Sequence, residues 1–184
     1  VTIITAMMFV GCGSSDISEG VAKNDYPITI NGVTLNSQPT GVAVLSQNIA
    51  DVILTGGFEA TLKAKSEDCT QEDLSILPNL TIDDAQEMKS LGVTLVLVDE
   101  APTEQQTAAL QAQGIQVLVI SPEKSRDDCK LLYREVGSAM VGGNTGYTKG
   151  EKACDNVFYT LDDITRLVPS TGTQYTACYL YDLE

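Results

Sequence analysis

Residues 93–120, VTLVLVDEAPTEQQTAALQAQGIQVLVI, decide the fold. The stretch opens and closes with apolar runs at 93–98 and 115–120, and such runs without polar alternation are typical of strands buried on both faces. Between them, Thr103 to Gln106 has the form of a capping box, which predicts a helix that ends at Gly114. A strand, a helix and a second strand in this order predict a βαβ unit with parallel strands.

The same alternation of strands and helices occurs earlier in the chain. The apolar run at 41–45 predicts a buried strand, and Ser46 or Asn48 is placed to cap a helix that stops at Gly56-Gly57. A further strand is expected at 60–65. Before these elements, residues 26–38 alternate apolar and polar side chains around Asn31-Gly32, which predicts a hairpin with a two-residue turn.

A third helix is expected to begin at Thr81, with Asp83 and Asp84 in its first turn, where carboxylates favour the helix dipole, and to end at Gly92. Together these segments predict the α/β class, with a small parallel sheet and flanking helices. Ligands of such sheets bind beyond the carboxyl ends of the strands.

The second half of the chain is predicted to be helical. A helical pattern covers about 125–140, and a glycine-rich break at 142–146 separates it from a second helical stretch at 147–168. Apolar residues recur in that stretch at three- and four-residue spacing, at Ala153, Val157, Leu161, Ile164 and Val168. Residues 175–181 are typical of a strand, and such a strand needs sheet partners.

Composition excludes several classes of protein. The net charge is −14, from 11 basic and 25 acidic residues, and a surface of this sign repels nucleic acid. The chain has no His, so the usual hydrolytic triads and zinc sites lack their main residue. Cysteines occur at 12, 69, 129, 154 and 178 without a Cys-x-x-Cys pair, so neither a zinc knuckle nor a thioredoxin-type site is indicated.

The start of the chain resembles the end of a bacterial lipoprotein signal. Residues 1–10 are almost uncharged and apolar, Gly11-Cys12 follows, and the composition then turns polar. Phe9 departs from the usual Leu of a lipobox. The resemblance implies that Cys12 is lipidated and that the protein is anchored to the outer face of the cytoplasmic membrane. The alternative is a buried N-terminal strand with an ordinary core cysteine.

The order of the parts resembles the cobalamin, haem and iron-siderophore binding proteins of ABC importers, in which two α/β lobes are joined by a long backbone helix. The resemblance rests on the Tyr26-Pro27 start with its hairpin, on 41–54, on 77–80 and 91–98, and on Gly143–Gly146 before Lys149–Ala153. It implies the following division: a truncated signal at 1–12, a flexible tether at 13–25, an N-terminal lobe at 26–124, a helical segment at 125–172, and the start of a second lobe at 173–184.

The resemblance also implies that the rims of the two lobes trap a ligand between them. Polar side chains at the carboxyl ends of the expected strands are the candidates for ligand binding, because oriented hydroxyl, amide and carboxylate groups fix polar ligands: Ser46, Gln47, Asn48, Ser66, Glu67, Asp68, Asp99 and Glu100. The alternative is that they are caps and turn residues. The carboxylates lack the spacing of a calcium site, so no metal site is expected. No resident cofactor and no catalytic residue are expected either.

Family members dock on a permease through a carboxylate before the third strand. By resemblance, the docking candidates here are Asp83, Asp84, Gln86 and Glu87. The implied function is capture of an iron-siderophore, haem or cobalamin-type ligand and its delivery to the permease, without enzymatic turnover. Two alternatives remain. One is a truncated lipoprotein that serves as a surface interaction module. The other is a small Rossmann-like enzyme, although neither Gly11–Gly13 nor Gly142–Gly146 follows a strand and opens a helix.

Cys69 and Cys129 are both expected near the ligand edge of the sheet. Outside the cytoplasm they could form a disulfide, and free buried thiols are the alternative.

Overall fold

The computed structural model describes residues 25–122 and 124–167 and is built on a four-stranded parallel sheet. The strands are β3 (Val42–Val44), β4 (Leu62–Lys65), β5 (Leu95–Val98) and β6 (Gln116–Val119), in the order β4-β3-β5-β6. Each neighbouring pair is parallel. The predicted α/β class, with a small parallel sheet and flanking helices, is confirmed.

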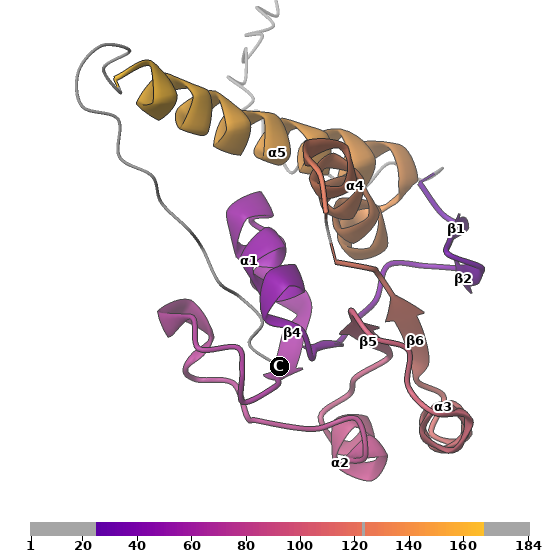
Figure 1. Ribbon diagram of the computed structural model, residues 1–184. Coiled ribbons are helices and arrows are strands. Elements are labelled where there is room, and N and C mark those ends of the chain that lie inside the picture. Colours follow the sequence, from indigo (N-terminus) through magenta and orange to yellow (C-terminus); the bar gives the residue numbers. More distant parts are fainter. Residues whose placement is uncertain (1–24, 123, 168–184) are drawn as a thin grey trace, which may run out of the picture.

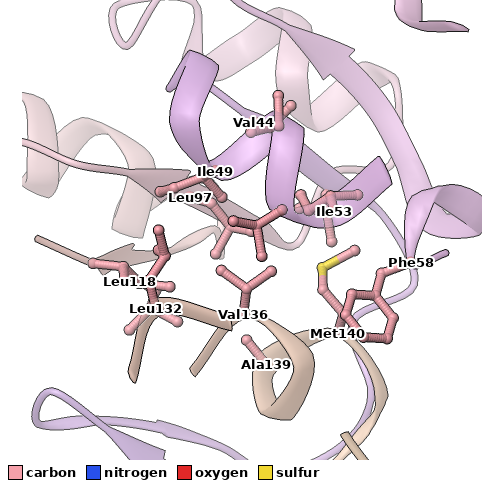
Figure 2. Packing of buried hydrophobic residues seen from close by; sticks show 14 of the residues in the cluster. Val44, Ile49, Ile53, Phe58, Leu97, Leu118, Leu132, Val136, Ala139 and Met140 are labelled. Carbon is pink, nitrogen blue, oxygen red and sulfur yellow. The ribbon is translucent and has the colours of Figure 1, made fainter. Parts of the chain in front are cut away.

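The two faces of the sheet are covered by different helices (Figure 1). One face packs on α1 (Gln47–Gly56), α4 (Arg126–Val141) and α5 (Gly143–Arg166), and the other on α2 (Ala85–Ser90) and α3 (Glu104–Ala112). Each face of the sheet has its own hydrophobic core, and successive strand residues point into opposite cores: Leu97 packs in the larger core and Val96 in the smaller one. Figure 2 shows the larger core, where Ile49 and Ile53 of α1 meet Val136 of α4 over the sheet.

The helices that follow β3 and β5 begin at the predicted caps. The Ser46 hydroxyl accepts a hydrogen bond from the Ile49 backbone N–H at 3.3 Å and starts α1, and Gly57 ends the helix in the left-handed conformation at φ 68°. Thr103 and Gln106 form the predicted capping box of α3. These local signals place both helices at the carboxyl ends of their strands.

Two short 3₁₀ helices, η1 (Glu59–Thr61) and η2 (Glu72–Leu74), flank β4. After η2 the chain returns to the sheet, where Asn79 forms an isolated parallel bridge with Lys65. The backbone N–H of Lys65 donates to the Pro78 carbonyl at 3.1 Å, and that of Leu80 donates to the Lys65 carbonyl at 2.8 Å. The segment therefore covers the edge of β4 at its carboxyl end.

The helix predicted to begin at Thr81 begins later, at Ala85. The Asp84 carboxylate accepts hydrogen bonds from the Thr81 backbone N–H at 2.6 Å and from its hydroxyl at 2.7 Å. These bonds hold 81–84 in a turn, because a short carboxylate side chain competes with helix formation. Asp83 and Asp84 thus precede α2 and do not lie in its first turn.

The predicted hairpin is present as β1 (Ile28–Ile30) and β2 (Val33–Leu35), paired antiparallel around Asn31-Gly32. Both turn residues have positive φ, 47° and 81°. The Asn31 side chain donates to the Val119 carbonyl at 3.0 Å and to the Glu135 carboxylate at 3.1 Å. The hairpin is thereby attached to β6 and α4.

The glycine-rich break predicted at 142–146 is confined to Gly142, and α5 begins at Gly143. The reason lies far away in the sequence: the carboxylate of Asp25, which is 3% exposed, accepts hydrogen bonds from the backbone N–H groups of Asn144 and Thr145. A carboxylate in this place satisfies N–H groups that would otherwise lack partners and favours the helix dipole.

The apolar stripe predicted on α5 is buried at its start and exposed at its end. Ala153 and Val157 pack against the larger core, whereas Leu161 is 47% exposed and Ile164 is 55% exposed. Val168, the expected strand at 175–181 and the expected signal with Cys12 lie outside the described residues. Of the tether expected at 13–25, only Asp25 is described, and it is buried. In the described part of the chain, no helix has the length and apolarity that a bilayer crossing requires.

Candidate functional site

The carboxyl ends of β3, β4 and β5 open on a hollow of about 460 Å³. The end of β3, the segments that follow β4 and β5, the turn before α2 and the start of α3 form its wall. The lining residues are Leu45, Ser66, Glu67, Asp68, Leu80, Thr81, Ile82, Val98, Asp99, Glu100, Ala101, Pro102 and Gln106. We call this surface the rim hollow. The predicted candidates Ser66, Glu67, Asp68, Asp99 and Glu100 are brought together there.

After β4, a tight turn presents two carboxylates. The Ser66 backbone N–H donates to the Val44 carbonyl at 2.9 Å, and the Ser66 carbonyl accepts from the Cys69 N–H at 3.2 Å. The Cys69 thiol is buried beneath this turn and interacts with the Ser66 hydroxyl at 3.3 Å. The turn is thus fixed from below, which leaves Glu67 and Asp68 exposed on the rim.

After β5, Asp99 is oriented by Ser46. The Ser46 hydroxyl donates to an Asp99 carboxylate oxygen at 2.7 Å while it also caps α1. Ser46 is only 3% exposed and does not line the hollow, so its hydroxyl makes these two hydrogen bonds and is not accessible to a ligand there. Asp99 is half-buried and Glu100 is exposed, so both remain able to contact a ligand.

The floor of the hollow is apolar, and the sequence analysis did not identify it. Leu45, Leu80, Ile82 and Val98 supply it. Leu77-Pro78 can be recognised in the sequence as the start of this segment. The packing of the segment beside β4 is a tertiary contact that hydrophobic periodicity does not reveal. An apolar floor surrounded by polar groups is the usual composition of a small-molecule site.

Lys65, the residue before Ser66 of the rim hollow, is already engaged in hydrogen bonds. Lys65 is 7% exposed, and its ammonium group donates to the Asn79 side chain at 2.7 Å and to the Ser66 carbonyl at 3.3 Å. Its charge therefore holds two segments of the rim together. The groups that face outward around it are carboxylates, Glu67 and Asp68 on one segment and Glu100 on the next.

Gln47 and Asn48, also predicted to bind ligand, lie outside the rim hollow. Both are exposed on the first turn of α1, and the Gln47 carbonyl accepts a hydrogen bond from the Gln71 side chain at 3.3 Å. Neither residue is part of the hollow's lining, because α1 begins directly after the cap residue Ser46.

The predicted docking residues form a separate patch next to the hollow. Asp83, Asp84, Gln86 and Glu87 line a shallow depression with Ser90. Hydrogen bonds from Thr81 lower the pKa of Asp84 and keep it charged. Gln106, which lines the rim hollow, also donates to Asp83 at 2.9 Å. One hydrogen bond therefore joins a residue of the rim hollow to a residue of the patch.

Three other features limit the chemistry of the described residues. No group of three or more His, Cys, Asp or Glu side chains among them is arranged to hold a metal ion. The N-terminus of α5 is occupied by the Asp25 carboxylate, so Gly142–Gly146 is not a phosphate loop. Among the described residues, no disulfide joins Cys69 to Cys129, which was the pairing considered from the sequence.

The sequence matches no protein-family model and no curated protein. Its structure does resemble solved structures. One is described as a possible iron-binding (periplasmic solute-binding) protein from Staphylococcus epidermidis, with a TM-score of 0.58, 13% identity, and coverage of 75% of this chain and 55% of that one.

Two other matches are a periplasmic heme-binding protein from Pseudomonas aeruginosa and the periplasmic vitamin B12-binding protein BtuF of Vibrio cholerae. The first has a TM-score of 0.59, 13% identity, and coverage of 70% of this chain and 46% of that one. The second has a TM-score of 0.52, 15% identity, and coverage of 70% and 50%. The chain therefore shares the fold of these binding proteins and spans about half of their length.

Proposed function

We propose that the chain is part of an extracytoplasmic solute-binding protein of an ABC importer, which captures a haem, cobalamin or iron-siderophore ligand and delivers it to a permease. The observation that carries the proposal is the rim hollow, where five candidate polar side chains meet over an apolar floor at the carboxyl ends of parallel strands. Its place in a fold shared with haem- and B12-binding proteins supports a binding role without turnover.

The rim hollow is one half of a binding cleft in this proposal. Its carboxylates lie at the surface, and a ligand placed there would stay open to solvent on its other side. This chain covers only about half of the length of the matching structures. Exposed Leu161 and Ile164 at the end of α5 also give a second lobe an apolar surface to cover.

The charge of the rim narrows the class of ligand. Glu67, Asp68 and Glu100 face the hollow, while Lys65 is held by Asn79. Arg126, at the start of α4, is paired with Asp162 at 2.6 Å. Because the described lining of the rim hollow includes carboxylates and no Lys or Arg side chain, it suits a ligand part that is neutral or cationic, and it repels one that is anionic.

The docking patch and Cys12 complete the proposed route. Exposed Asp83, Gln86 and Glu87 offer acceptors to permease arginines, and the bond from Gln106 connects this patch to the rim hollow. Cys12 would carry the lipid that keeps the protein at the outer face of the cytoplasmic membrane, close to the permease.

A binding screen tests the proposed function. We expect cyanocobalamin, haem or a neutral ferric hydroxamate siderophore to raise the melting temperature, because each would bind only the folded state. For the active compound, Asp68→Ala and Glu100→Ala should each weaken binding by about tenfold, through loss of hydrogen bonds to a charged group. Glu59→Ala is the matched control, because Glu59 is an exposed carboxylate before β4, at the opposite end of that strand.

If none of the three compounds shifts the melting temperature, or if Glu59→Ala weakens binding as much as the rim variants, the proposed function is wrong.

A further inference from the structure

α4 and α5 lie against each other (Figure 1) with their backbones in contact, and the ion pairs between them, such as Arg126 with Asp162 and Lys130 with Asp155, show that they run antiparallel. A methyl group at Gly137 would overlap the Gly146 carbonyl oxygen, and one at Gly150 would overlap the carbonyl oxygen of Tyr133. Gly137 thus faces Gly146, and about one helical turn further along each helix Tyr133 faces Gly150. One more step in the same directions brings Cys129 opposite Cys154.

Two ion pairs close to the cysteines agree with this register. Lys130, next to Cys129, binds Asp155, next to Cys154, at 2.8 Å. Arg134 binds Glu151 one turn closer to the glycines. Side chains one position from each cysteine are therefore held together across the interface, which fixes the two cysteines as neighbours.

The two thiols interact directly. Cys154 is fully buried, and burial raises its pKa to about 12, with further contributions from neighbouring Cys129 and from the hydrogen bond between them. Cys129 is partly exposed, which makes it the thiol that a reagent in solution reaches. Cys69, the third described cysteine, lies beneath the rim and interacts with Ser66 and with the Val44 carbonyl at 3.8 Å.

We propose that Cys129 and Cys154 are a disulfide-forming pair that joins α4 to α5. In the first step, the Cys129 thiolate attacks a small-molecule or protein disulfide, which releases one thiol and leaves a mixed disulfide on Cys129. Cys154 then loses its proton and attacks the Cys129 sulfur, which releases the second thiol. Two cysteine thiols are oxidised, and the disulfide reagent is reduced to two thiols.

The bond would fix the direction in which α5 leaves the lobe. The glycine contacts hold the start of α5 against α4. Beyond Cys154 the helix is only partly buried at Val157, and Leu161 and Ile164 further along are exposed. A covalent link between these regions limits the angle between the helices. Formation in the cell rests on the proposed extracytoplasmic location, where disulfides persist. The geometry does not depend on it.

The purified protein can be tested directly. It is incubated folded with oxidised glutathione, alkylated, digested without reduction and analysed by mass spectrometry. We expect a linked pair of peptides that contain Cys129 and Cys154, and a melting temperature that rises by about 5 °C or more on oxidation. Cys129→Ser should abolish both effects. Cys69→Ala, the matched control, should retain the linked peptides.

The proposal is overturned if Cys129 and Cys154 are both alkylated after oxidation, if Cys129 stays in a mixed disulfide with glutathione, or if either pairs with Cys12, Cys69 or Cys178. A linked pair without ligand binding in the screen contradicts the proposed function alone. Ligand binding without a linked pair contradicts the disulfide alone.

Discussion

The rim hollow and the α4–α5 interface use acidic side chains in opposite ways. Across α4 and α5, carboxylates are paired: Asp155 binds Lys130 and Glu151 binds Arg134. At the rim, Glu67 and Glu100 are exposed and, among the described residues, have no hydrogen-bond or ion-pair partner. In this chain of net charge −14, Lys130 and Arg134 neutralise carboxylates between two helices, whereas the carboxylates of the rim remain available for binding.

The two regions also differ in packing. At the α4–α5 interface, glycine backbones touch, so the helices tolerate no added atom. At the rim, side chains lie on turns whose backbone is already bonded to the sheet, as Ser66 is bonded to Val44. We therefore expect substitutions at the helix interface to change stability, and substitutions at the rim to change binding. The following predictions test this contrast, from the largest expected effect to the smallest.

Gly146→Val should cause the largest loss of stability. Its side chain would overlap the Gly137 carbonyl oxygen and the Ser138 backbone, and overpacking of this kind costs about 3 kcal/mol. The measurement is the free energy of unfolding in urea. Gly32→Ala is the control, because no atom lies within 4 Å of its added methyl, although φ is +81°. It should cost about 1–2 kcal/mol. Equal losses would contradict the backbone contact.

Asp25→Ala should be next. The Asp25 carboxylate accepts from two backbone N–H groups and from the Thr145 hydroxyl at the start of α5. Loss of such a cap costs about 1–2 kcal/mol. The same unfolding measurement applies, and Asp25→Asn, which keeps a side-chain acceptor, should lose less. If Asp25→Ala is as stable as the original protein, the cap contributes nothing.

Tyr26 should make stability depend on alkaline pH. Burial, and secondarily the neighbouring Asp25 charge, raise the pKa of Tyr26 to about 12, while in the unfolded chain it titrates near its ordinary value of about 10. The neutral phenol is favoured in the folded state, so its contribution is complete below about pH 10 and is lost as the pH rises towards 12.

The test is urea unfolding of the original protein and of Tyr26→Phe between pH 9 and pH 12. The stability advantage of the original protein over Tyr26→Phe should shrink as the pH rises. A constant difference would mean that Tyr26 titrates alike in both states.

The smallest effect on stability is expected at the rim. Glu67→Gln and Glu100→Gln should change the free energy of unfolding by less than about 0.5 kcal/mol, as exposed substitutions do. The same variants should reduce affinity for any ligand whose cationic or hydrogen-bond donor groups they contact. A stability loss as large as that of Asp25→Ala would show that the rim carboxylates are structural.

The parallel sheet could be predicted from sequence because its signals are local. Continuous apolar runs mark β3, β5 and β6, and the caps Ser46 and Thr103 are side chains that act within a few residues of themselves. The same local order predicted which polar residues follow each strand, and therefore most of the polar side chains around the rim hollow.

The errors arise where a distant or competing contact decides the structure. The glycines at 143–146 look like a break, yet Asp25, more than a hundred residues away, caps them into a helix. The turn at 81–84 looks like a helix start until the Asp84 carboxylate bonds back to Thr81. The apolar floor depends on Leu80 and Ile82 docking beside β4, and no periodicity signals such a contact.

Amide hydrogen exchange tests most directly whether the rim hollow binds ligand. The protein would be compared with and without the compound, among cyanocobalamin, haem and the ferric hydroxamate siderophore, that gives the largest thermal shift. We predict slower exchange at 66–69 and 99–102, and unchanged exchange along α4. Protection that spares both rim segments and appears elsewhere would contradict the assignment of the rim hollow as the binding surface.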